Sequence, residues 1–176
     1  MHYLKRKRVI SWALYDWANS AFATTVMAGF FPLFFKSFWA ADLSPAESTA
    51  VIGTTNSLAG LFIMLLAPIL GAYSDLGKLK KKFLAFFALL GVLSTGYLYF
   101  IPQGDWVIAA SLYALAVVGF SGGNIFYDSL LPGVASKKKI DYASSLGFSI
   151  GYIGGGILFL VNVLMYQYPE MFGIAN

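Results

Sequence analysis

The sequence predicts an all-α membrane protein with five transmembrane helices and a cytoplasmic N-terminus. Of its 176 residues, 59% are hydrophobic and only 11% are charged, and the mean hydropathy is +0.71, far above that of a typical soluble domain. Eleven of the twelve Lys and Arg residues lie in three short clusters, at 5–8, 78–82 and 137–139, and the loops between these clusters carry acids. Because positive charge stays on the cytoplasmic side of a bilayer, this alternation indicates a chain that crosses the membrane repeatedly.

The first two helices follow from the length of their apolar stretches and from the residues that precede them. A bilayer core about 30 Å thick needs about 20 helical residues. Five stretches reach this length, at 9–35, 50–73, 83–101, 106–131 and 142–166. The first begins directly after the basic cluster. The second is preceded by Ser44, Pro45 and Glu47, a helix start signal in an outer loop.

The other three helices are separated by turn residues and by the remaining basic clusters. The third helix follows the lysines at 78–82 and ends at the turn 102–105, which reads Pro-Gln-Gly-Asp. The fourth runs from this turn to Pro132 and Gly133, and the fifth follows the lysines at 137–139. Aromatic residues suited to the headgroup region gather near the expected helix ends: Trp12, Trp39, Tyr97, Tyr99, Trp106, Tyr166 and Tyr168. We therefore expect a single transmembrane domain over 1–176 whose C-terminus lies outside.

Composition excludes several classes of function. The chain has no Cys, which removes disulfides, thiolate metal sites and cysteine nucleophiles. Its one His, His2, lies in the N-terminal tail, so neither a metal site nor a cofactor is expected. The net charge of +4 is divided among short loops and forms no single basic face, so no nucleic-acid partner is expected. The first apolar stretch is too long for a signal peptide and lacks a small-residue cleavage site.

Two carboxylates fall inside predicted spans and are the main candidates for a functional site. An ionised Asp in a bilayer costs at least about 2.5–3.5 kcal/mol on insertion scales, so it normally faces a cavity or a partner. Asn19 follows Asp16 by three residues, and Asn124 precedes Asp128 by four, so each acid shares a helix face with an amide. Both acids are expected in the cytoplasmic half, where one cavity would hold them. For Asp16, an interfacial acid near a helix start is the alternative.

The predicted spans offer these acids no buried ion pair. No Lys, Arg or His lies deep in a span, since Lys36 is at the outer end of the first. The acids would be neutralised by protonation, by hydrogen bonds from neighbours such as Tyr15 and Tyr127, or by a cation from a solute or another segment. We hypothesise that Asp16 or Asp128 couples proton movement to transport. The expected pathway for solute and protons is lined by Tyr15, Asp16, Asn19, Asn124, Tyr127 and Asp128.

Glycines predict a close helix contact along the fifth helix. Gly147, Gly151 and Gly155 repeat every four residues, and Gly154 and Gly156 lie beside them. Such a strip has no side chains, so a neighbouring backbone can approach closely. Two interpretations stay open: a plain packing surface, or a seam that moves or seals between conformations.

The loop between the second and third helices carries more than the lysines that orientation requires. It reads Gly71-Ala-Tyr-Ser-Asp75-Leu-Gly77-Lys78. An acid does not help to set topology, whereas Asp75 can pair with a basic residue or a helix N-terminus across the cytoplasmic mouth. We expect Gly71, Asp75, Gly77 and Lys78 to form a gating loop.

This loop resembles the Gly-x-x-x-Asp-Arg/Lys-x-Gly-basic-basic motif that the major facilitator superfamily carries between its second and third helices. It differs in that Leu76 replaces the basic residue and Gly77 comes one position early. The glycine strip is similar to the superfamily's antiporter motif, with Tyr152 where Pro is usual. The stretches 11–22 (SWALYDWANSAF) and 124–132 resemble the first and fourth helices of the branch related to the fungal vacuolar amino-acid effluxers. The resemblance spans essentially the whole chain.

The resemblance implies a secondary active transporter, and no enzyme, that moves a small solute by alternating access across a bacterial cytoplasmic (inner) membrane. Superfamily members have two halves of six helices each, so the chain corresponds to an incomplete N-terminal half that lacks the sixth helix. The expected partners are the lipid bilayer, a small solute, protons, and the missing C-terminal helices in the same or another chain. Two alternatives stay open: a truncated, non-transporting membrane subunit, and an intramembrane aspartyl hydrolase whose two acids share a proton.

Overall fold

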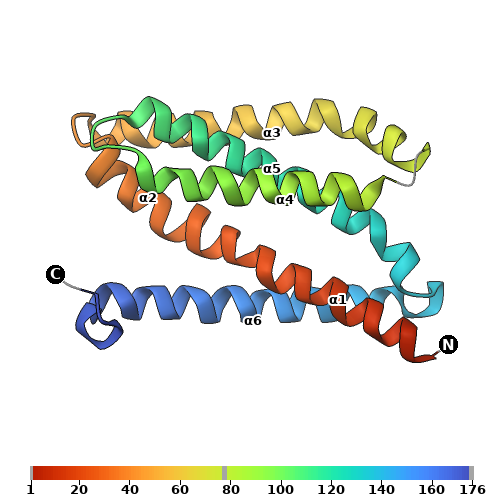
Figure 1. Ribbon diagram of the computed structural model, residues 1–176. Coiled ribbons are helices and arrows are strands. Elements are labelled where there is room, and N and C mark those ends of the chain that lie inside the picture. The colour runs from red at the N-terminus through yellow and green to blue at the C-terminus, as the bar shows by residue number, and fades with distance from the viewer. Residues whose placement is uncertain (1, 77–78, 175–176) are drawn as a thin grey trace. The chain divides into compact units, whose positions relative to one another are not determined.

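The computed structural model describes residues 2–76 and 79–174, and every regular element in these residues is a helix (Figure 1). Five helical segments among them are long and apolar enough to cross a membrane, which confirms the predicted all-α membrane fold. They are Lys7–Trp39, Pro45–Asp75, Lys80–Phe100, Trp106–Val134 and Lys137–Gln167. The helices extend beyond the apolar stretches because Lys, Arg and Glu at their ends are themselves good helix formers.

The first span is a continuous helix with two widened segments. It consists of α1 (His2–Ala21), the π-helix η1 (Phe22–Phe30), α2 (Phe31–Phe34) and the π-helix η2 (Phe35–Trp39). In the π-helical segments the backbone hydrogen bonds reach five residues back: Phe31 N–H donates to Val26 O, and Ala40 N–H donates to Phe35 O at 2.7 Å. Pro32 lies in α2, between the two π-helical segments, and because it has no N–H it removes one backbone hydrogen bond from this span. Segments of this kind often lie at functional sites.

The second span, α3 (Pro45–Leu76), begins at the start signal that the sequence carries. Ser44 N–H donates to Glu47 Oε2 at 2.9 Å, and Glu47 N–H donates to Ser44 Oγ at 3.3 Å. This reciprocal pair is a capping box, and Pro45 occupies the first helical position, where its missing N–H has no cost. The helix therefore begins five residues before the predicted bound of 50.

The remaining helices keep the predicted order. They are α4 (Lys80–Tyr97) with the 3₁₀ turn η3 (Leu98–Phe100), α5 (Trp106–Val134), the 3₁₀ turn η4 (Lys137–Lys139), α6 (Ile140–Gln167) and the 3₁₀ turn η5 (Pro169–Phe172). In the turn before α5, Gly104 has a φ of +88°, a left-handed conformation that favours glycine. Pro132 does not end α5, which continues to Val134, because a proline in the last turn removes only one hydrogen bond.

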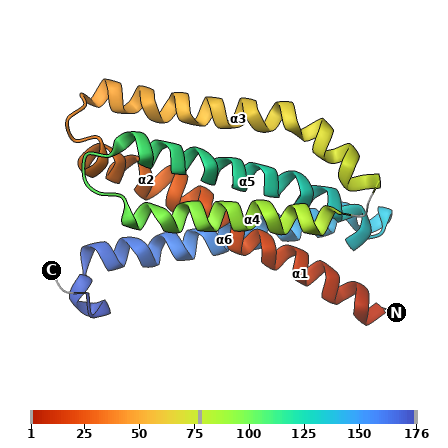
Figure 2. The ribbon, with the colours of Figure 1, turned by 45° about the horizontal axis from the view of Figure 1, so that its top comes forward.

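The chain forms two compact units. The first unit holds α1 and η1, up to Phe31, together with the segment from Leu131 onward, which contains α6. In this unit α1 packs along α6, and the contact continues into η1 (Figures 1 and 2). This pairing joins the first and last spans of the chain within one unit.

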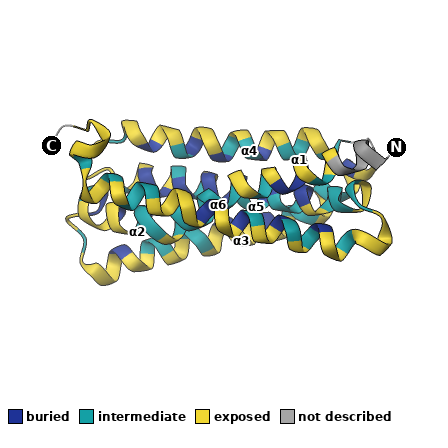
Figure 3. Ribbon diagram, turned by 90° about the horizontal axis from the view of Figure 1, so that it is seen from below, coloured by how far each residue is buried: buried dark blue, intermediate teal, exposed yellow. Residues whose placement is uncertain are grey.

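The second unit, Pro32–Leu130, contains α3, α4 and most of α5. Ring stacking joins α4 to α5, where Phe126 stacks on Phe83 and Phe87 with centroid distances of 5.0 and 5.8 Å. The most apolar window of α5 is 50% buried, against 17% for α3 and α4, so α5 is the most enclosed helix of this unit. Exposed residues predominate on α3 and α4 (Figure 3) and include many Leu, Phe and Ile side chains. Apolar faces of this kind suit contact with lipid.

Candidate functional site

Asp16 and the glycine strip, which the sequence suggested separately, lie in one contact between α1 and α6. A Cβ atom placed on Gly151 would lie 2.5 Å from Asp16 Oδ2 and 2.7 Å from Ser20 Oγ. Any side chain at position 151 would therefore displace the carboxylate or the hydroxyl. The two oxygens converge on bare backbone of α6, and glycine leaves the space that they occupy.

The same contact continues one turn further along both helices. Thr24 Oγ1 donates to Gly155 O across the seam, with an oxygen–oxygen distance of 3.2 Å, and lies 3.1 Å from Ser20 O in its own helix. A Cβ on Gly155 would meet Thr24 Oγ1 at 2.9 Å. Asp16, Ser20 and Thr24 recur every four residues, as Gly151 and Gly155 do. A polar ridge that runs from α1 into η1 therefore lies in a groove of α6 that has no side chains.

The other glycines of α6 contribute unequally to this seam. Gly154 makes the closest approach, because a Cβ there would overlap the indole ring of Trp17. Gly147 is buried in α6. Gly156, which the sequence analysis included in the seam, is exposed, and a Cβ on it would meet nothing within 4 Å in the described structure. A helical face repeats every 3.6 residues, so it passes through positions 151, 154 and 155 and leaves 156 outside.

The remaining residues of the predicted pathway are divided between the two units. On α1, Tyr15 and Asn19 are half-buried beside Asp16. On α5, Tyr127 is buried, Asn124 is half-buried and Asp128 is exposed. Asp16 and Asn19 therefore lie on one helix, α1, and Asn124 and Asp128 lie on another, α5. That both groups line one pathway stays a prediction, since they belong to different units.

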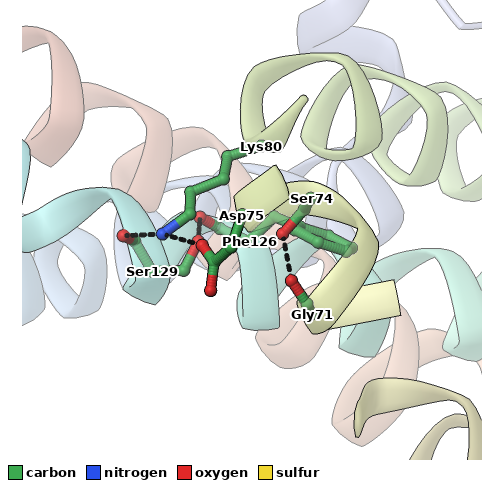
Figure 4. A network of polar contacts seen from close by, with 6 residues as sticks. All are labelled: Gly71, Ser74, Asp75, Lys80, Phe126 and Ser129. Carbon is green, nitrogen blue, oxygen red and sulfur yellow. Dashed lines mark hydrogen bonds and ion pairs between the residues drawn. The ribbon is translucent and has the colours of Figure 1, made fainter. Parts of the chain in front are cut away.

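The loop acid Asp75 is paired at the end of α3 (Figure 4). Its Oδ1 lies 2.7 Å from Nζ of Lys80, the first residue of α4, and both side chains are partly exposed. Lys80 Nζ also donates to Ser129 O of α5 at 3.4 Å. One ammonium group therefore connects the ends of three helices.

The other members of the predicted gating loop are placed only in part. Gly71 lies in the last turns of α3, where its carbonyl accepts a hydrogen bond from Ser74 Oγ at 2.9 Å (Figure 4). Gly77 and Lys78 lie outside the described residues. The sequence did not indicate which basic residue pairs with Asp75. The structure shows that this residue is Lys80. Its position at the start of the next helix could have indicated the pairing.

A second glycine contact, between α4 and α5, was missed by sequence reasoning. A Cβ on Gly119 would overlap Gly91 N, and a Cβ on Gly122 would overlap the Phe87 ring. Gly119 and Gly123 are four residues apart, the same small-residue spacing that marked the strip on α6. That spacing was the signal that could have located this contact.

The groups gathered in these contacts suit proton and hydrogen-bond chemistry. Among the described residues no group of three or more His, Cys, Asp or Glu side chains is placed to hold a metal ion. The α1–α6 seam instead offers a carboxylate, two hydroxyls and backbone carbonyls inside a segment apolar enough to span a membrane. A carboxylate accepts hydrogen bonds when ionised and donates one when protonated, so its protonation changes what the seam can bind.

Five apolar spans define a multi-pass integral membrane protein. Its similarity to known proteins assigns it to the major facilitator superfamily. The chain belongs to the family of Atg22-like vacuole effluxers, whose family model matches residues 43–143. The matched segment contains α3, α4 and α5, with the Asp75–Lys80 pair and Asp128. Asp16 and the glycine strip of α6 lie outside it.

Similar proteins come from bacteria and fungi. The chain is 43% identical over 158 residues to YxiO of Bacillus subtilis (strain 168), described as an uncharacterized MFS-type transporter, in an alignment that covers 89% of this chain and 37% of that protein. It is 28% identical over 175 residues to an uncharacterized protein of Aquifex aeolicus (strain VF5), with 98% and 42% covered. It is 25% identical over 170 residues to autophagy-related protein 22 of Coccidioides immitis (strain RS), with 72% and 28% covered. The chain thus spans less than half the length of these relatives. No solved structure matches it.

Proposed function

We propose that this chain forms part of a secondary active transporter that moves a small solute by alternating access, with coupled proton movement, in a bacterial cytoplasmic membrane. The observation that carries the proposal is the position of Asp16, whose carboxylate rests on the bare backbone of Gly151 inside a spanning segment. Further helices, in the same chain or in another, would supply the opposite wall of the pathway. The family match and the printed name of YxiO as an MFS-type transporter support it.

The setting of Asp16 suits a group that changes its protonation state. An ionised Asp within a span costs at least about 2.5–3.5 kcal/mol on insertion scales, so a carboxylate in that position needs water, a partner or a proton. Ser20 Oγ converges with Asp16 Oδ2 over Gly151. Protonation gives the acid a hydrogen to donate, and ionisation removes it. The strength of the α1–α6 contact would therefore depend on whether Asp16 is protonated.

The Asp75–Lys80 pair suits a gate that opens and closes in each cycle. Exposed ion pairs contribute about 0–1 kcal/mol, because water and salt screen them. A contact of that size holds the ends of α3, α4 and α5 together and still breaks readily. A deeply buried pair would resist opening far more strongly.

Water access to the two acids tests the proposal. The chain has no Cys, so each single-cysteine variant reports on one position. We expect Asp16→Cys and Asp128→Cys, in the full chain in membrane vesicles, to react with a membrane-impermeant thiosulfonate. Leu160→Cys, at an exposed apolar position of α6, should stay unreactive because lipid covers it. If neither acid position reacts in an intact assembly, the solute pathway does not exist.

Proton coupling has a separate test. Proteoliposomes loaded with a pH-sensitive dye are challenged with a panel of amino acids, sugars and amines, and a solute-dependent change of internal pH identifies a substrate. Asp16→Asn or Asp128→Asn should then abolish or shift the pH dependence of transport. Asp141→Asn, at an exposed acid in the first turn of α6, is the matched control and should leave it unchanged. Normal pH dependence in both pathway variants would exclude coupling through these acids.

A further inference from the structure

A groove between α3 and α5, in the second unit, is used by none of the functions described above. It has a volume of about 460 Å³, within the range of about 300–1,000 Å³ that is usual for small-molecule sites. Its walls are mostly Ala, Val and Leu side chains. Three hydroxyl residues, Thr54, Thr55 and Ser111, and one aromatic residue, Trp106, also line it. The groove therefore combines an apolar body with a few polar groups, as ligand sites do.

One end of the groove, which we call its mouth, lies at the first turns of α3 and α5, beside Ala50, Val51 and Trp106, and the acids near it favour a cation. Glu47 lies three and four residues before Ala50 and Val51, which line the groove, so it shares their face of α3. Asp105 lies directly before Trp106. Both acids are exposed, and no basic side chain lines the groove. An anionic ligand would find no counter-charge there.

The net charge at this end of the unit is also negative. Asp42 adds a third acid in the loop before α3, and Lys36 on η2 is the one base in the described loops and helix ends here. Among the described residues the ion pair is the one between Asp75 and Lys80, so no acid is paired with Lys36 there. Three acids against one base attract a cation toward the mouth.

The mouth is held in place by contacts within the unit. Trp39 Nε1–H donates to Ile101 O at 3.1 Å, and Gly104 N–H donates to Phe38 O at 3.3 Å. These bonds attach the turn before α5 to η2. These two hydrogen bonds therefore hold the turn that carries Asp105 in place next to the groove.

Two groups inside the groove suit an ammonium ion in particular. Ser111 Oγ donates its proton to Val107 O at 2.8 Å, so its lone pairs remain free to accept a hydrogen bond from a ligand N–H. Trp106 also lines the groove, and of the aromatic side chains an indole attracts cations most strongly. Hydroxyl acceptors, an indole side chain and acids at the mouth are complementary to one positive charge on an apolar body.

We propose that this groove binds a monovalent organic cation with an apolar body, an aryl- or alkylammonium. Trp106 and Ser111 contact the ligand, and Glu47 and Asp105 attract its charge to the mouth. The site is a binding site in its own right, and equilibrium binding requires no transport. Loss of transport with intact binding would contradict the proposed function alone, and loss of binding with intact transport would contradict this site alone.

The test is equilibrium binding to the full chain in lipid nanodiscs, with empty nanodiscs subtracted. The probes are phenethylammonium and its uncharged isostere 2-phenylethanol. We expect saturable binding of the cation with a Kd at least about 10-fold lower than that of the alcohol, since the two differ in charge and hardly in shape. Trp106→Leu should weaken cation binding by about 10-fold or more.

Two further variants separate the charge effect from a folding defect. Glu47→Gln with Asp105→Asn should remove most of the preference for the cation, and Gln can keep the capping bond to Ser44 N–H. Thr95→Val, on α4 and outside the groove, is the matched control and should bind the cation as the unmodified chain does. Equal affinity for the cation and the alcohol, or no effect of Trp106→Leu, would overturn the proposal and would identify an apolar groove filled by lipid chains.

Discussion

Alanine at the two facing glycines of the α4–α5 contact should give opposite results. A Cβ on Gly119 would overlap Gly91 N and lie 2.7 Å from both Gly91 Cα and Phe87 O. A Cβ on Gly91 would lie 3.6 Å from Ala116 O and Phe120 N, which is an ordinary van der Waals separation. The asymmetry arises because the Cα–Cβ direction of Gly119 points at the backbone of α4, whereas that of Gly91 passes beside α5.

The geometry sets the size of the difference. The atoms that Gly119→Ala would meet belong to backbone, so no side-chain rotation relieves the overlap, and α4 and α5 must move apart. Overpacking of this kind costs about 1–3 kcal/mol. Replacing a helical glycine with alanine returns at most about 1 kcal/mol of helix propensity. We expect Gly119→Ala to lower the free energy of unfolding by about 1–2 kcal/mol and Gly91→Ala to leave it unchanged or raise it by up to about 1 kcal/mol.

The assay is reversible unfolding of the full chain in mixed micelles, followed by circular dichroism as the fraction of dodecyl sulfate rises. Gly60→Ala is the matched control, because Gly60 lies in the interior of α3 and a Cβ on it would meet nothing within 4 Å in the described structure. This variant isolates the propensity gain. Equal losses for Gly119→Ala and Gly91→Ala would refute the reasoning, since they would mean that α4 and α5 do not meet as described. No loss for Gly119→Ala would refute it as well.

Two further predictions concern the α1–α6 seam and the loop. Gly154→Ala should destabilise the chain by about 1–3 kcal/mol in the same assay, because a Cβ there would overlap the Trp17 ring. Gly156→Ala should have no such effect, because a Cβ there would meet nothing within 4 Å in the described structure. Equal effects of the two substitutions would contradict the α1–α6 seam. A double-mutant cycle with Asp75→Asn and Lys80→Met should give a coupling energy of about 0–1 kcal/mol that falls with added salt, as exposed ion pairs do. Lys81→Met, at the exposed neighbouring lysine, should show no coupling to Asp75→Asn, and a coupling equal to that of Lys80→Met would refute the assigned pair.

The number, order and type of the helices could be predicted because a bilayer imposes them locally. Each span needs about 20 apolar residues and each end is marked by charge or by turn residues. The start of α3 is an example, since Ser44, Pro45 and Glu47 specify it without any long-range contact. The π-helical segments on both sides of Pro32 could not be predicted, because a proline within a span is compatible with several local distortions.

The site was predictable in its parts and not in its assembly. The sequence singled out Asp16 as an acid within a span, and it singled out Gly151 and Gly155 by their spacing. Helical periodicity gives the face on which a residue lies, but it does not say which helix packs against that face. The contact between Asp16 and Gly151 joins positions 135 residues apart, and only the structure supplies it.

The two membrane acids, alike in the sequence, have different surroundings and should serve different steps. Asp16 lies over Gly151 beside Ser20, so a change in its charge acts first on the α1–α6 seam. Asp128 is exposed and directly precedes Ser129, whose carbonyl accepts the hydrogen bond from Lys80. A change in the charge of Asp128 therefore acts near the ammonium that holds α3, α4 and α5 together. If the chain transports by alternating access, protonation of Asp16 should control movement of the α1–α6 seam. The charge of Asp128 should instead control closure of the gate formed by Asp75 and Lys80. The two Asp→Asn variants should therefore impair transport in different ways.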